Sequence, residues 1–171
     1  VNFGGGVLPR AGLTDAFVAK YDAAGTHLWS ARFGNAESQA ALDVALDATG
    51  AVWITGFFRG TINFGGALLT SAGGADLFAA KFAPAGTHVF SQRYGSANDD
   101  QIGAAIAVDS TGAPILTGWF TGTVTFGGAS LVSAGQTDAF VLKLTAAGAH
   151  AFSQRYGDVN FQYGRDVAVT G

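Results

Sequence analysis

The chain has 171 residues, of which 49% are hydrophobic and only 12% are charged, and its formal net charge is −3. This composition excludes an intrinsically disordered chain, and the lack of any Lys/Arg run argues against a nucleic-acid-binding surface. The chain contains no Cys, which excludes disulfides and thiolate metal sites.

Two further features concern export and completeness. No apolar run approaches the roughly 18–20 residues of a membrane-spanning helix, and no signal peptide is visible. The first residue is Val1 and the chain contains no Met. We therefore expect a mature fragment, an excised segment or a window from a longer protein.

One stretch of the sequence occurs three times and organises the rest. The copies are DAFVAKYDAAGTHLWSARFG at 15–34, DLFAAKFAPAGTHVFSQRYG at 76–95 and DAFVLKLTAAGAHAFSQRYG at 138–157. Their first residues step by 61 and then 62 positions, and similarity at a fixed period is the signature of a repeat architecture. The sequence predicts a partial repeat at 1–34, full repeats at 35–95 and 96–157, and a partial repeat at 158–171.

Each full repeat is predicted to contain four strands, beginning with one at Leu42–Leu46, Ala104–Val108 and Arg165–Val169. Good helix formers at 37–48 favour a helix there. The matching stretch 99–110 carries a Gly and β-branched residues. Because equivalent positions share a conformation in a repeat protein, a strand is preferred.

A turn and a second strand follow. Asp at the first and Gly at the fourth position of 47–50 and 109–112 favour a type I turn whose Asp side chain accepts backbone N–H groups. The second strand is expected at Val52–Phe58 and Pro114–Phe120. Both copies contain Thr-Gly, and a Gly within a strand marks a bulge or a close approach of another backbone.

The rest of the repeat is a link and two more strands. Gly-Gly pairs in 61–72 and 123–134 predict a small hairpin, and Asn2–Gly5 repeats the same element. The third strand is Ala16–Tyr21 with its equivalents, whose two faces are both apolar, as in a strand covered on both sides. After a Gly turn, the fourth strand is predicted at the ranges His27–Phe33, His88–Tyr94 and Ala149–Tyr156.

Repeated four-stranded antiparallel units predict an all-β fold of β-propeller-type blades. The segments AVDSTGAPILTG (107–118), DAFVLK (138–143) and SQRYG (153–157) resemble the bacterial β-propeller repeat family called SBBP. The resemblance implies a propeller in an exported or cell-surface bacterial protein and implies no particular activity. Propellers close with about four to eight blades, so the ring is expected to be incomplete within this chain.

The incomplete ring leaves three alternatives open. The chain is a window of a longer repeat protein, or two chains close a roughly six-bladed ring, or a contact that does not close generates a fibre. An unpaired strand edge is a template for another chain. The expected assembly edge comprises Val1, Asn2, Phe3, Tyr163, Arg165, Val167 and Val169.

Recurring polar residues suggest chemistry, but their recurrence in every repeat favours a structural role. His27, His88 and His150 suggest zinc ligands, yet equivalent positions of successive blades lie apart, so they are interpreted as strand-start residues at the rim. The other recurring residues are predicted to join strands through charge-assisted hydrogen bonds. They are Asp15, Asp76, Asp138, Arg32, Arg93 and Arg155.

Two stretches suggest binding sites, but each has features that favour a structural role. The loop Ser96–Gln101 offers oxygen ligands for calcium, but it lacks a spaced D-x-D-x-D-G pattern. Trp29, Trp53 and Trp119 suggest sugar stacking, but neither Trp53 nor Trp119 recurs at its equivalent position, which favours packing between blades.

The sequence contains no nucleophile elbow, phosphate loop, Ser/His/Asp spacing or paired carboxylates that indicate catalysis. The expected function is therefore a non-catalytic structural or protein-interaction module without a cofactor. Its expected partners are other copies of itself or further blades of a longer chain. The alternative is a lectin-like propeller that binds carbohydrate or another ligand, and an enzyme comes third.

Overall fold

The computed structural model describes residues 1–170, and all regular structure in this range is β. The strands are β1 (Ala16–Tyr21), β2 (His27–Phe33), β3 (Gln39–Leu46), β4 (Val52–Phe58), β5 (Thr61–Ile62), β6 (Leu69–Thr70), β7 (Asp76–Phe82), β8 (His88–Tyr94), β9 (Gln101–Val108), β10 (Pro114–Phe120), β11 (Thr123–Val124), β12 (Leu131–Val132), β13 (Asp138–Leu144) and β14 (His150–Tyr156). Over these residues there is no helix of the length and apolarity needed to cross a membrane. The all-β prediction is confirmed.

Two antiparallel sheets of four strands have the same strand order. The central sheet is ordered β3-β4-β7-β8, and the C-terminal sheet is ordered β9-β10-β13-β14. The first lies within residues 35–95 and the second within 96–157. Strands β1 and β2 form the N-terminal hairpin, which corresponds to the last two strands of a sheet. The short pairs β5–β6 and β11–β12 are the predicted link hairpins.

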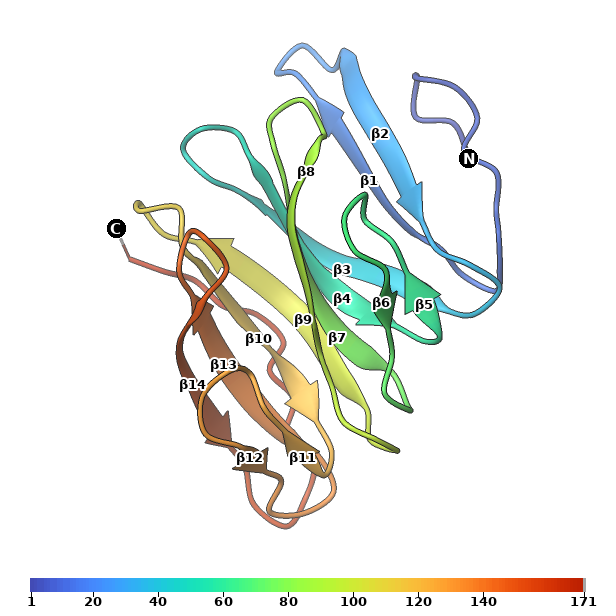
Figure 1. The fold of residues 1–171 in the computed structure, drawn as a ribbon. Coiled ribbons are helices and arrows are strands. Elements are labelled where there is room, and N and C mark those ends of the chain that lie inside the picture. Colours follow the sequence, from blue (N-terminus) through green and yellow to red (C-terminus); the bar gives the residue numbers. More distant parts are fainter. Residues whose placement is uncertain (171) are drawn as a thin grey trace.

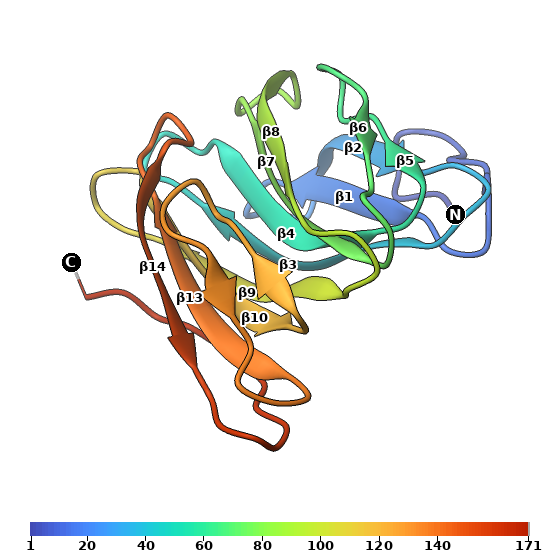
Figure 2. The ribbon, with the colours of Figure 1, turned by 60° about the horizontal axis from the view of Figure 1, so that its bottom comes forward.

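The hairpin and the two sheets pack face to face in chain order (Figure 1). One core, which includes Val18 and Phe78, joins the hairpin to the central sheet. A second core, which includes Trp53 and Leu116, joins the central sheet to the C-terminal sheet. The middle strands of the central sheet, β4 and β7, are therefore covered on both faces, and Trp53 and its neighbour Ile54 are both 0% exposed. Both views place the N-terminus and the C-terminus at opposite ends of this stack (Figures 1 and 2).

Burial on both faces was predicted for every third strand, and the structure shows it only in part. Strand β7 is buried along both faces, because it lies in the middle of the stack. The equivalent strand β1 is buried on one face only, and Phe17 on its other face is 51% exposed. Among the described residues no sheet covers that outer face of β1.

The predicted strand Arg165–Val169 is not formed, and residues 162–170 have no regular secondary structure. Its equivalents β3 and β9 are strands, and both begin three residues earlier than predicted. The difference has a physical cause. Strands β3 and β9 each pair with a following strand, β4 or β10, whereas the described chain supplies no such partner after residue 169, and a strand forms only with a partner.

The predicted turn and glycine chemistry is confirmed. The Asp47 carboxylate accepts hydrogen bonds from the Thr49 and Ala51 N–H groups at 2.9 and 3.0 Å, within a turn closed by Gly50 N–H to Asp47 O. The Thr-Gly pairs of β4 and β10 lie opposite register shifts in β3 and β9. A Cβ added to Gly118 would overlap the Ile102 carbonyl oxygen, so both a bulge and a close backbone approach occur there.

Candidate functional site

The three recurring histidines hold the link hairpins in place. The Nε2 atoms of His27, His88 and His150 lie 3.0, 3.0 and 3.1 Å from the hydroxyl oxygens of the Ser residues three positions later. Each imidazole also lies against a Gly-Gly turn, and a Cβ at Gly66 would overlap the ring of His88. In residues 1–170 no three His, Cys, Asp or Glu side chains gather in a group that suits a metal ion.

The recurring Asp and Arg residues meet in each repeat. Arg93 Nη1 donates to Asp76 Oδ2 at 2.7 Å, and Asp76 is fully buried. Arg155 donates to the equally buried Asp138, and Arg32 lies 3.2 Å from Asp15. Each pair joins the last two strands of a sheet or hairpin, as expected of a charge-assisted hydrogen bond that holds strands together.

The carboxylates of the acidic loop 96–101 accept hydrogen bonds from groups of the protein. Asp99 accepts from the Ser96 hydroxyl at 3.1 Å, and Asp100 accepts from the Ala75 N–H at 2.7 Å and from Arg59 at 3.2 Å. The equivalent loop at 35–39 is closed by amide side chains. The carboxylates therefore stabilise the loop and its contact with the preceding strand connection.

The three tryptophans lie at packing positions. Trp53 is 0% exposed within the core between the two sheets. Trp29 is half-buried and packs 6.1 Å from Phe82 between ring centroids. Trp119 is half-buried and is covered by Tyr163 at 5.3 Å and by the Arg165 guanidinium at 5.1 Å.

A recurring Lys on the third strand completes the polar framework. Lys81 lies 3.1 Å from Asp47, and Lys143 pairs with Asp109. Burial on its own raises the pKa of Asp47, but hydrogen bonds from Thr49, Lys81 and the backbone outweigh it and lower the pKa to about 2. The hydrogen bond from Lys143 is the main cause that lowers the pKa of Asp109 below its ordinary value.

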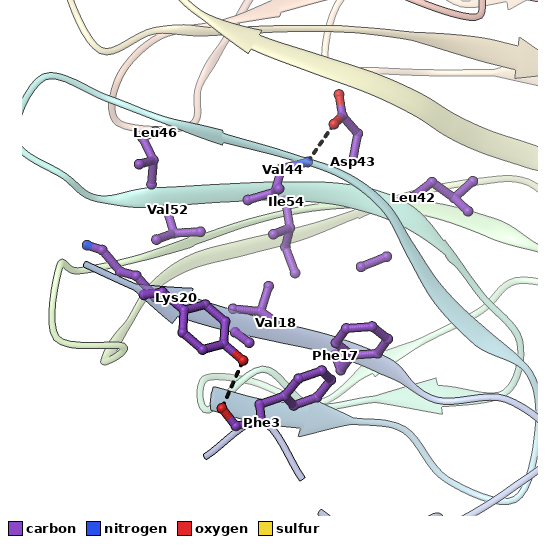
Figure 3. A pocket seen from close by; sticks show the side chains of 13 residues that line it. Phe3, Phe17, Val18, Lys20, Leu42, Asp43, Val44, Leu46, Val52 and Ile54 are labelled. Atoms are coloured by element: carbon purple, nitrogen blue, oxygen red, sulfur yellow. Dashed lines mark hydrogen bonds between the residues drawn. The ribbon is translucent and has the colours of Figure 1, made fainter. Parts of the chain in front are cut away.

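The equivalent of these lysines in the N-terminal hairpin has no carboxylate partner in the described part of the chain. Lys20 Nζ donates to the backbone carbonyls of Gly50 at 2.6 Å and Pro84 at 3.1 Å. It lies at the rim of a groove, which we call the inner groove (Figure 3). The inner groove therefore contains a cation that only backbone dipoles balance.

The inner groove lies between β1 and β3 and has a volume of about 740 Å³. On the side of β3 its wall carries Leu42, Val44 and Leu46, which are 45%, 56% and 55% exposed. Figure 3 shows these side chains and Ile54 of β4 on one side, facing Val18 and Phe17 on the other. The lining is mostly aliphatic and aromatic, so the groove suits an apolar or amphipathic occupant.

The predicted assembly edge is placed differently at the two ends. Val1 and Asn2 are engaged in a small loop, in which Val1 bonds Leu8 and the Asn2 side chain accepts from Gly4 and Gly6. These contacts lie within the first eight residues, so the assembly role of Val1 and Asn2 stays a prediction. Phe3 does lie at the open N-terminal face, where it stacks on Phe17 at 4.8 Å and lines the inner groove.

At the other end, residues 158–170 form what we call the C-terminal segment, which lies along the outer face of the C-terminal sheet (Figure 2). Gln162 N–H donates to Thr137 O at 2.8 Å and Gly164 N–H to Gly118 O at 3.1 Å. Tyr163 and Arg165 contact Trp119. The predicted edge residues Val167 and Val169 are half-buried.

Sequence reasoning missed the inner groove. Leu42, Val44 and Leu46 were expected on a strand, but nothing marked them as exposed, because an apolar strand residue is ordinarily buried. A signal was nevertheless present. The N-terminal partial repeat has no copy of the first two strands, and these are the strands that would cover β3.

No family model matches the chain. Among curated proteins, the chain is similar to "Regulatory protein FlaEY" of Caulobacter vibrioides, with 31% identity over 94 residues, which cover 52% of this chain and 10% of that protein. The chain thus spans about a tenth of the length of this relative. The similarity establishes no family for this chain, and the regulatory role in the printed name belongs to that protein.

Proposed function

We propose that the chain is a non-catalytic structural or protein-interaction module made of β-propeller-type blades with a period of 61–62 residues. Its ends receive further units of the same kind, either from a longer chain or from other copies. Four antiparallel strands in each sheet and face-to-face packing of successive sheets support blades. The resemblance to SBBP repeats supports placing the module in an exported or cell-surface protein.

One observation carries this proposal: the faces left open at the ends of the stack are equivalent to faces that are buried inside it. Ile106 on β9 is 4% exposed because β3 and β4 cover it. Val44 on β3 occupies the equivalent position and is 56% exposed. An apolar face that is buried in one repeat and open in another suits addition of a further repeat.

The experiment joins two copies of the chain through a further copy of Thr111–Thr123, which restores the 61-residue spacing and supplies the second strand that residues 162–170 lack. We expect backbone amides of residues 163–169 in the first copy to exchange hydrogen at least about tenfold more slowly than in the single chain. The control joins the two copies through a Gly/Ser linker of equal length. Equal exchange rates in the two joined proteins would refute the proposal.

A further inference from the structure

The C-terminal segment occupies the position of a third β3-type strand. The sequences QAALDVAL at 39–46, QIGAAIAV at 101–108 and QYGRDVAV at 162–169 align at Gln39, Gln101 and Gln162. The N–H of each Gln donates to a backbone carbonyl just before the third strand of the preceding unit, at 3.0, 2.7 and 2.8 Å. The three stretches therefore enter the stack in the same way, although only the first two form strands.

Two residues lie on the side of β3 that faces β9. Asp43 Oδ2 accepts from the backbone N–H of Ile106 at 2.8 Å, while its Oδ1 accepts from the N–H of Val44 at 2.8 Å. Ala45 packs against the core between the two sheets. This contact is the pattern by which one repeat covers the first strand of the next.

The equivalent side of the C-terminal segment is not covered by another strand of the described chain. Asp166 and Ala168 are the equivalents of Asp43 and Ala45, and both are exposed. Asp166 Oδ1 accepts from the Val167 N–H at 2.8 Å, as Asp43 does from the residue that follows it. Its Oδ2 has no hydrogen-bond partner in residues 1–170, so this oxygen is free to accept from another backbone.

The inner groove carries the complementary side. Val44 and Leu46 are equivalent to Ile106 and Val108 of β9, which β3 covers. They are 56% and 55% exposed in the groove. The groove also contains Lys20, whose ammonium has no carboxylate partner in the described residues.

We propose that the inner groove of one copy binds the C-terminal segment of a second copy, with Asp166 and Ala168 packed on Val44 and Leu46. This contact repeats the apolar part of the packing of β3 on β9, because the N–H of Val44, the equivalent of the Ile106 donor, already donates to Asp43 Oδ1. Residues of β1, β3 and β4 line the groove, whereas the segment lies on the C-terminal sheet, and the N-terminal hairpin and the C-terminal sheet are the two ends of the stack (Figures 1 and 2). The association is therefore head to tail, and each copy has one groove and one segment to offer. The inference rests on the proposed function and names the partner that binds the N-terminal face of the chain.

The test measures the weight-average mass of the intact chain by sedimentation equilibrium. A contact made by one strand is small, so we expect a micromolar or weaker dissociation constant. The protein concentrations measured therefore extend to about 1 mM. Val44→Lys places a charge in the groove, and Asp166→Lys reverses the charge of the segment. We expect each to weaken association at least about tenfold. Val132→Lys is the matched control, because Val132 is 61% exposed on β12 and belongs neither to the lining of the inner groove nor to the C-terminal segment.

Mixing the two variants makes the test specific. Val44→Lys retains an intact segment and Asp166→Lys retains an intact groove, so an equimolar mixture is expected to form a dimer that grows no further. Circular dichroism establishes that each variant is folded. Three results would overturn the inference: a monomeric wild-type chain at about 1 mM, association that neither variant weakens, or a mixture that stays monomeric. If residues 163–169 are protected from exchange in the joined protein but the wild-type chain is monomeric, the proposed function is supported and a second copy is excluded as the partner.

Discussion

Replacement of Arg93 with Leu tests how much the recurring Asp–Arg pairs stabilise the fold. Arg93 donates to Asp76 Oδ2 at 2.7 Å, and the same oxygen accepts from the Ala72 N–H at 2.8 Å. Asp76 is 0% exposed, and its other oxygen has no partner within the described residues. In the variant the carboxylate stays buried with one backbone hydrogen bond and no cation.

The magnitude follows from burial. Removing one partner of a buried ion pair costs about 3–5 kcal/mol, because the remaining charge is uncompensated. The Arg93 side chain is 32% exposed, so water screens part of the interaction and a loss of about 2–3 kcal/mol is expected. For a chain of this size, this corresponds to a fall in melting temperature of about 5–10 °C.

The assay is urea unfolding followed by tryptophan fluorescence, with a second ion pair of the chain as the control. Arg59 and Asp100 lie 3.2 Å apart but are 46% and 49% exposed, so Arg59→Leu is expected to cost less than about 1 kcal/mol. Adding Asp76→Asn to Arg93→Leu is expected to recover part of the loss, since no charge then remains buried. If Arg93→Leu and Arg59→Leu destabilise equally, burial does not set the strength of these pairs and the reasoning is refuted.

Three further predictions concern the turn, the bulge and the link hairpin. The pKa of Asp47 is about 2 in the folded chain against an ordinary 3.8, so its carboxylate stabilises the fold above about pH 4 and this contribution is lost as the pH falls toward 2. In urea titrations, Asp47→Asn should therefore lower the free energy of unfolding by about 2 kcal/mol at pH 6 and by almost nothing near pH 2. Gly118→Ala should cost about 3 kcal/mol or more, because its Cβ meets a backbone oxygen that cannot move independently; an unchanged urea midpoint would contradict the close approach. Phe64→Ala should cost about 3–5 kcal/mol, because Phe64 is 2% exposed and packs 4.8 Å from Phe78; a loss below 1 kcal/mol would mean that the link hairpin is not part of the core.

Much of the local structure was predictable because it depends on residues close together in sequence. The Asp-Ala-Thr-Gly turn at 47–50 closes on its own backbone through the Asp47 side chain. The Thr-Gly pair at 117–118 indicated a bulge, and the register shifts there. Comparison of two copies also decided between helix and strand for residues 37–48, where helix propensity alone favours the wrong structure.

The sequence by itself determined the repeat, its strands and turns, and the residues that recur in each copy. It did not determine which copies are covered. Val44 and Ile106 are β-branched aliphatic residues at equivalent positions on equivalent strands, yet one is 56% and the other 4% exposed. Residues 162–169 likewise resemble β3 in sequence but form no strand. Turn chemistry and strand propensity act within a few residues, whereas burial and strand pairing depend on which neighbouring sheet is present, and only the tertiary structure decides that.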